Sequence, residues 1–193
     1  ALSERYRIVT FDMRGHGESV CAPRHKWDIE CMLGDLNAVL EATTDGSVHL
    51  VGESIGGTVA LAYAMTWPER IKTLTISNGA HIGASIGALQ DWRDIIERDG
   101  MGGWSRMMME RRFYPGAISR AAREWFETQQ SQSDPSAILG ALEVLVGADL
   151  RPDLALAHMP VQILHPDDSP FIAVSVAADL CERLPNARLQ VFS

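Results

Sequence analysis

The sequence predicts an α/β fold, a parallel doubly wound sheet with a helical lid inserted between two of its strands. Short apolar segments alternate with helical patterns in residues 1–80 and again in residues 158–193, which is typical of a parallel sheet. Residues 81–157 carry helical patterns and no convincing strand. A plain crossover needs only about 10–12 residues. We therefore divide the chain into a first core part (1–80), a lid (81–157) and a second core part (158–193).

Each element has a local signal. The predicted strands are residues 7–11, 48–51, 71–76, 161–164 and 188–192. Apolar residues recur at helical spacing between positions 29 and 40, and an Ala-rich helix over residues 58–66 ends at Trp67 and Pro68. In the lid, Asp134 followed by Pro135 is a typical helix start. A last helix runs to about residue 184, before the final strand.

Composition excludes several classes of function. The 193 residues carry 17 basic and 25 acidic side chains, a net charge of −8, which argues against a nucleic-acid partner. The longest apolar run, residues 59–65, is far too short to span a membrane, and no secretory signal is visible. Three scattered cysteines predict neither a disulfide framework nor a zinc site. We expect a cytoplasmic protein with reduced thiols and without a metal or other cofactor.

The strongest local signal for chemistry is a G-x-S-x-G stretch formed by Gly52, Ser54 and Gly56. It lies where an apolar strand meets a helix, which is the context that a nucleophile elbow requires. We expect Ser54 to have strained backbone angles and to act as the nucleophile, with the Ile55 N–H facing a developing oxyanion. Gly56 and Gly57 would let the helix pack close to neighbouring strands. A glycine-rich turn with an exposed serine is the alternative.

A serine nucleophile needs a histidine that is oriented by a carboxylate. The acid belongs on the loop after the fourth predicted strand, where Asp167 and Asp168 both stand. The histidine should follow the last strand, but none of the six histidines lies downstream of this loop. His165 is near the acid but precedes it. Each histidine is better explained by a structural role.

Three blocks resemble the α/β-hydrolase superfamily over essentially the whole chain. Residues 11–19 (FDMRGHGES) are similar to its D-x-R-G-H-G-x-S block, residues 51–57 (VGESIGG) to its nucleophile elbow, and residues 167–171 to its acid loop. Within the superfamily, the chain most resembles 3-oxoadipate enol-lactonases, through stretches such as 68–74 and 77–83. The resemblance implies hydrolysis of a small ester or lactone.

The chain departs from the superfamily pattern at two places. In a gapless comparison Ser169 stands where the family has its acid, so the acid is Asp167 or Asp168, or it lies elsewhere, near Asn78 after the third strand. The early strands, the loop that gives a second oxyanion donor and the catalytic histidine of the family also have no counterpart here. The chain is therefore expected to be an internal fragment that associates in isolation.

The expected function is a cofactor-free serine hydrolase that cleaves a small, largely apolar ester or lactone through an acyl-enzyme on Ser54. Acyl transfer, C–C bond hydrolysis and perhydrolysis use the same elbow and remain alternatives, as does a non-catalytic member that binds a ligand or partner through its lid. The lid carries several flexible or aromatic side chains that suit an apolar pocket but equally fit its core. They are Trp104, Met107, Met108, Met109 and Phe113.

Overall fold

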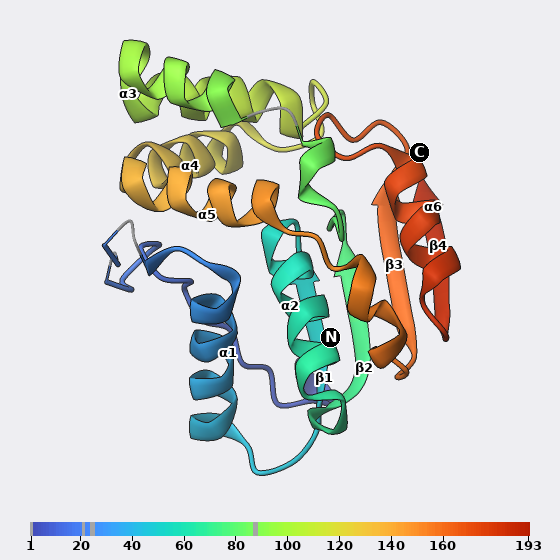
Figure 1. The fold of residues 1–193 in the computed structure, drawn as a ribbon. Coiled ribbons are helices and arrows are strands. Elements are labelled where there is room, and N and C mark those ends of the chain that lie inside the picture. Colours follow the sequence, from blue (N-terminus) through green and yellow to red (C-terminus); the bar gives the residue numbers. More distant parts are fainter. Residues whose placement is uncertain (1, 21, 24–25, 87–88) are drawn as a thin grey trace.

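A computed structural model describes residues 2–20, 22–23, 26–86 and 89–193 (Figure 1). The strands are β1 (Val48–Glu53), β2 (Ile71–Ser77), β3 (Val161–Pro166) and β4 (Ala187–Phe192). The helices are α1 (Ile29–Thr43), α2 (Ile55–Thr66), α3 (Leu89–Arg112), α4 (Arg120–Ser131), α5 (Pro135–Gly147) and α6 (Val174–Arg183). Short 3-10 turns are η1 (Leu2–Glu4), η3 (Pro68–Arg70), η4 (Gly83–Ser85) and η5 (Arg151–Leu156).

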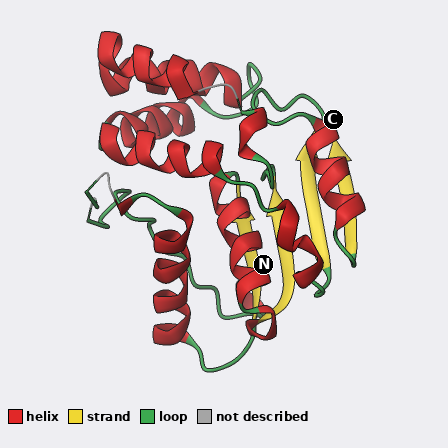
Figure 2. Cartoon of the chain, in the orientation of Figure 1, coloured by secondary structure: helices red, strands yellow, loops and turns green. Residues whose placement is uncertain are grey.

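The four described strands form one parallel sheet in the order β1-β2-β3-β4. Each right-handed crossover moves in the same direction across the sheet, so α2 and α6 lie on the same face, together with α1 (Figures 1 and 2). All carboxyl ends of the strands point toward α3, α4 and α5 (Figure 2). The α/β fold with a parallel sheet is confirmed.

The main core lies between the sheet and the helices on this face. Every residue of α2 from 57 to 65 is buried, which explains why its sequence is apolar all round rather than striped. Helix α1 is amphipathic and buries Met32, Leu36 and Leu40. It begins at Asp28, whose carboxylate accepts a hydrogen bond from the Cys31 N–H at 2.6 Å. The burial of α2 against the sheet and α1 holds in place the N-terminus of α2, which directly follows β1.

Helices α3, α4 and α5 are inserted between β2 and β3. Among the described residues from 81 to 157 there is no strand, only an isolated antiparallel bridge between Ile82 and Asp149. Helix α5 starts as expected, with Asp134 as N-cap and Pro135 in the first turn. Helix α5 contributes buried side chains to two apolar clusters. The main core contains its Ala137, Ala141 and Val144. A second cluster, beneath the insertion, contains its Leu142 and Leu145. The insertion is therefore packed directly onto the α/β core.

The predicted strand at residues 7–11 is wrong. These residues have no regular secondary structure and pair with no described strand. Ile8 is 55% exposed and Phe11 43% exposed. The segment is held by side chains instead: Arg7 donates to the carbonyl of Thr43 at the end of α1, at 3.0 Å, and the Tyr6 ring stands edge-on to His49 in β1. Its apolar pattern is compatible with a strand, but the ladder hydrogen bonds that define one are not formed.

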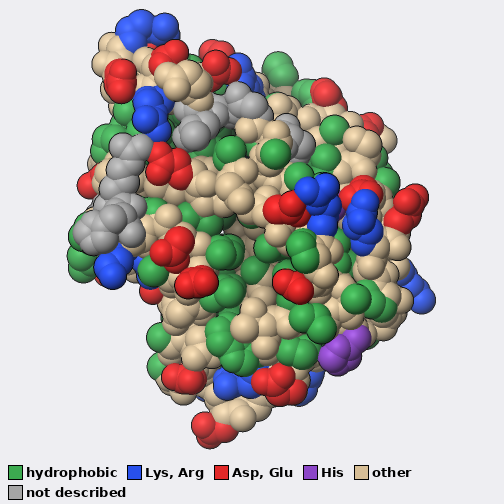
Figure 3. All heavy atoms as spheres, viewed as in Figure 1, with side chains coloured by type: hydrophobic (Ala, Val, Ile, Leu, Met, Phe, Trp, Pro, Cys, Tyr) green, Lys and Arg blue, Asp and Glu red, His purple; other side chains and the backbone are tan. Residues whose placement is uncertain are grey.

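Charged side chains of both signs are interspersed on the face of the molecule seen in Figure 3, with apolar side chains between them. Within the described residues, no helix is long and apolar enough to cross a membrane. No group of three potential metal ligands from His, Cys, Asp and Glu gathers anywhere in that part of the chain.

Candidate active site

Ser54 occupies a sharp turn between the last residue of β1, Glu53, and the first residue of α2, Ile55. Its backbone angles are φ 53° and ψ −123°, a sparsely populated conformation for a residue with a side chain. The Ser54 N–H donates to the Ser77 carbonyl of β2 at 2.8 Å, which ties the turn to the neighbouring strand. The strained backbone expected from the motif is present.

Three glycines around this turn lie in contacts too tight for an unstrained side chain. A Cβ on Gly52 would overlap the carbonyl group of Gly56. A Cβ on Gly57 would lie 3.0 Å from the Cγ2 of Ile76, and one on Gly79 only 2.7 Å from the same methyl group. Gly57 thus provides the expected close approach of helix and strand. The same expectation for Gly56 is wrong, since a Cβ there would meet nothing within 4 Å.

The loop after β3 holds three consecutive polar residues that contact three different elements. The Asp167 N–H donates to the carbonyl of Phe192 at the end of β4, at 2.8 Å. The Asp168 carboxylate accepts a 3.1 Å hydrogen bond from the Tyr114 hydroxyl in the insertion. The Ser169 hydroxyl donates to the side-chain oxygen of Asn78, after β2, at 2.9 Å. The loop therefore connects both neighbouring strands and the insertion.

A cavity of about 600 Å³ lies at the carboxyl ends of the strands. Ser54, Asp167 and Asp168 all line it, so the structure brings the predicted nucleophile and both candidate acids to one site. Asn78 also lines it. Ile55 is not among the lining residues, and its partly buried side chain packs against the apolar clusters instead. Only its backbone N–H is relevant to the expected role.

The inner wall of this cavity is apolar and aromatic. The Trp92 ring lies 5.9 Å from the Phe171 ring and 5.2 Å from the Trp104 ring, both edge-on. Of the five lid side chains singled out from the sequence, Met108 and Phe113 line the cavity, whereas Trp104 and Met109 are buried in the insertion. The last of the five, Met107, packs against the same apolar cluster as Trp104.

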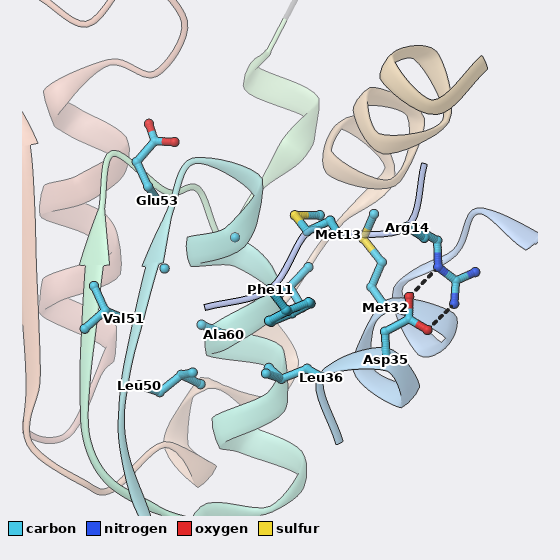
Figure 4. A pocket seen from close by; sticks show the side chains of 13 residues that line it. Phe11, Met13, Arg14, Met32, Asp35, Leu36, Leu50, Val51, Glu53 and Ala60 are labelled. Atoms are coloured by element: carbon cyan, nitrogen blue, oxygen red, sulfur yellow. Dashed lines mark hydrogen bonds and ion pairs between the residues drawn. The ribbon is translucent and has the colours of Figure 1, made fainter. Parts of the chain in front are cut away.

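The rim of the cavity carries charge that the sequence analysis did not assign. Glu53 lies at the carboxyl end of β1 and lines the cavity. Desolvation raises the pKa of its carboxyl, and the positive charge of Arg112 opposes this rise. Glu53 also lines a smaller cavity of about 260 Å³, together with Arg14 and Asp35, and Figure 4 shows its carboxylate directed away from these two side chains. The hydrogen bond to the Asp168 carboxylate raises the pKa of Tyr114, so this phenol stays a donor.

None of the described histidines lines the cavity. Each has a local partner instead: a backbone carbonyl for three of them, a threonine hydroxyl for one and a carboxylate for one. The five are His16, His49, His81, His158 and His165. His25 lies outside the described residues. The structural interpretation of these side chains agrees with their contacts.

A parallel sheet whose strand-to-helix turn presents a strained serine to a cavity at the carboxyl edge defines an α/β hydrolase. The family model described as alpha/beta hydrolase fold matches residues 1–115, and the chain belongs to this family. It is 26% identical over 193 residues to 3-oxoadipate enol-lactonase 2 of Acinetobacter baylyi, covering 97% of this chain and 71% of that protein.

Solved structures show the same fold. The enol-lactonase from Burkholderia xenovorans LB400 superposes with a TM-score of 0.84 at 22% identity, over 94% of this chain and 70% of that one. An esterase from Exiguobacterium antarcticum superposes with a TM-score of 0.81 at 22% identity, over 94% of this chain and 71% of that one. The expected membership of the α/β-hydrolase superfamily is confirmed.

Proposed function

We propose that this α/β hydrolase cleaves a small ester or lactone through an acyl-enzyme on Ser54. The observation that carries this proposal is the backbone of Ser54, strained at the strand-to-helix turn and placed on the wall of the 600 Å³ cavity. Strain of this kind persists where the surrounding structure enforces it, and it is concentrated at functional sites. Tight glycine contacts enforce it here.

In this mechanism the Ser54 hydroxyl attacks the substrate carbonyl, and the negative charge develops on the carbonyl oxygen. The Ile55 N–H, at the positively polarised start of the twelve-residue helix α2, stabilises that charge. Asp167 or Asp168 orients a histidine that takes the serine proton and returns it to the leaving group. No described residue on the cavity wall is a histidine, so the base of this mechanism is a histidine outside the described lining.

The same proposal assigns α3, α4 and α5 the role of a lid. Trp92, Met108 and Phe113 contribute apolar surface from the insertion to the cavity that holds Ser54. An apolar wall with a few polar groups suits a small, largely apolar acyl group. The similarity to 3-oxoadipate enol-lactonase 2 supports a hydrolysable carbonyl compound, such as an ester or lactone, as the substrate.

A second candidate is a non-catalytic protein that binds a ligand in this cavity. Two observations favour it: the cavity wall has no described histidine, and Ser169 is hydrogen-bonded to Asn78 where relatives of this kind are expected to carry their acid.

A fluorophosphonate probe on the protein distinguishes the two candidates. Covalent labelling that Ser54→Ala abolishes, and that the exposed control Ser175→Ala leaves intact, supports the hydrolase. A correctly folded protein that the probe does not label overturns it and supports the binding protein. Mass spectrometry of the labelled peptide identifies the modified serine.

A further inference from the structure

We propose that the side-chain amide of Asn78 binds the substrate, by donating a hydrogen bond to an uncharged oxygen near the scissile carbonyl. The preferred substrates would then be esters or lactones with a second neutral acceptor, such as a ketone or ring oxygen. This inference rests on the proposed function of Ser54.

Asn78 and the candidate nucleophile Ser54 both lie beside the end of β2, at the cavity. Asn78 directly follows Ser77, whose carbonyl oxygen accepts the Ser54 N–H, and both Asn78 and Ser54 line the same cavity. The Asn78 N–H donates to the carbonyl of Leu164 at 2.8 Å, which pins its backbone to β3. Asn78 is therefore fixed between two strands and beside the candidate nucleophile.

The backbone of Asn78 has an unusual conformation. Among the described residues other than glycine, only Ser54 and Asn78 have a positive φ, and that of Asn78 is 47°. Asparagine tolerates this left-handed region better than most residues with a side chain, but at a cost. Both strained residues lie on one cavity wall, which is where strain serves function rather than packing.

Hydrogen bonds from the loop after β3 orient the Asn78 side chain. The Ile172 N–H donates to the Ser169 oxygen at 3.3 Å, and the Ser169 hydroxyl donates in turn to the Asn78 side-chain oxygen at 2.9 Å. This chain of donors satisfies the amide oxygen and sets the amide plane. The amide nitrogen has no hydrogen-bond acceptor among the described residues, and the half-buried Asn78 lines the cavity. Ser169 thus orients Asn78.

The charge around the cavity selects the kind of acceptor. Four carboxylates line it against two guanidinium groups, so an anionic substrate group meets net repulsion. They are Glu53, Glu110, Asp167 and Asp168 against Arg111 and Arg112. A neutral oxygen of the substrate can instead accept a hydrogen bond from the Asn78 amide without being repelled by the carboxylates that line the cavity.

The test compares two p-nitrophenyl esters, the 4-oxopentanoate and the pentanoate, which differ in one ketone oxygen. We expect the natural protein to hydrolyse the keto ester with the higher kcat/KM. Asn78→Asp, which keeps the shape but loses the donor, and Asn78→Gly, which accepts the positive φ, should each lower the keto-to-alkyl ratio about three- to tenfold. Ser169→Ala should lower it partly, and Ser169→Thr, which keeps the hydroxyl, should preserve it.

The matched control is Asn186→Asp, which makes the same charge change at an exposed turn before β4 and should leave the ratio unchanged. An equal ratio in the natural protein and in both Asn78 variants, with Ser54 still labelled by the fluorophosphonate, overturns this inference alone. Loss of labelling in the natural protein overturns the proposed function instead. Using two variants keeps the test decisive if one of them fails to fold.

Discussion

The Ser54 N–H and the Ser77 carbonyl oxygen are joined by a 2.8 Å hydrogen bond. Glu53 and Ser77 are the last paired residues of β1 and β2, so this bond continues the ladder one residue beyond the strand, into the turn. The turn is thereby anchored to the sheet at the point where its backbone is strained. Its geometry depends on the neighbouring strand as well as on the local sequence.

The glycines at the turn should differ sharply in their tolerance of a methyl group. Gly52→Ala should destabilise the protein by more than about 2 kcal/mol, because its Cβ would overlap the Gly56 carbonyl group. Gly56→Ala is the matched control: it lies in α2, its Cβ meets nothing, and alanine favours a helix by up to about 1 kcal/mol. Denaturant unfolding measures both. Equal stability of the two variants would contradict the observed packing.

The two candidate acids should be separable by their contacts. The Asp168 carboxylate is already hydrogen-bonded to Tyr114, whereas no described residue is hydrogen-bonded to the Asp167 carboxylate. We therefore expect Asp167→Asn to lower kcat by about 10⁴-fold, the scale known for removal of a triad carboxylate. Asp168→Asn should act mainly on KM.

A double-mutant cycle provides the control for this assignment. Tyr114→Phe and Asp168→Ala remove the same hydrogen bond, so their effects should be similar and should not add in the double variant. If Asp168→Asn causes the large loss of kcat, Asp168 is the acid and Tyr114 positions it. Kinetics on the natural protein decide between the two residues.

Much of the fold could be predicted from the sequence because its signals are local. The strands β1 to β4 appear as apolar runs, and the turn at Ser54 appears as a fixed spacing of glycines. Residues 7–11 show the limit of such signals. Their apolar side chains are compatible with a strand, but strand pairing depends on a neighbour elsewhere in the chain, and β1 does not pair with them.

The site was predictable only in part for the same reason. Ser54, Asp167 and Asp168 could be found because each follows a strand at the same sheet edge. The contact of Tyr114 with Asp168 spans 54 positions, and that of Asn78 with Ser169 spans 91. No periodicity in the sequence encodes pairs so far apart, so the connections within the site had to come from the structure.

Arg14 should not be replaceable by lysine. Its guanidinium binds both carboxylate oxygens of Asp35 in α1, at 2.5 and 2.8 Å (Figure 4). It also donates to the backbone carbonyls of Lys26 and Cys31. Lysine keeps the charge but cannot form this fork. We expect Arg14→Lys to cost about 1 kcal/mol of unfolding free energy, a modest value because Asp35 is partly exposed to solvent.

The control for Arg14 is Arg98→Lys. Arg98 also forms an ion pair, but its side chain is 69% exposed to solvent. Among the described residues its only ion-pair partner is the adjacent Asp99. We expect no measurable change in stability. A similar loss in both variants would show that the fork on Asp35 is not what stabilises the segment before α1.

His81 should make stability depend on pH in the weakly acidic range. The imidazole is fully buried at the base of the insertion and bonds to the Asp179 carboxylate of α6 at 2.8 Å. Burial lowers the pKa of His81; Asp179 opposes this, while the positive charges of Arg183 and Arg151 add to it. The folded state therefore binds this proton less readily than the unfolded state, whose histidine pKa is about 6.5.

The sign of the effect follows from this difference. Stability is complete above the unfolded pKa and should fall as the pH drops from about 7 through 6, levelling off once the folded His81 is protonated. Asp179 behaves separately: the hydrogen bond from Arg183, and then that from His81, lower the pKa of its carboxyl, so its contribution is lost only near pH 4 and below.

Denaturant unfolding at pH 7.5, 6.5 and 5.5 should show the decline. His81→Gln should flatten the curve in this range, and the exposed His158→Gln should leave it unchanged. A decline that persists in His81→Gln would assign it to another group.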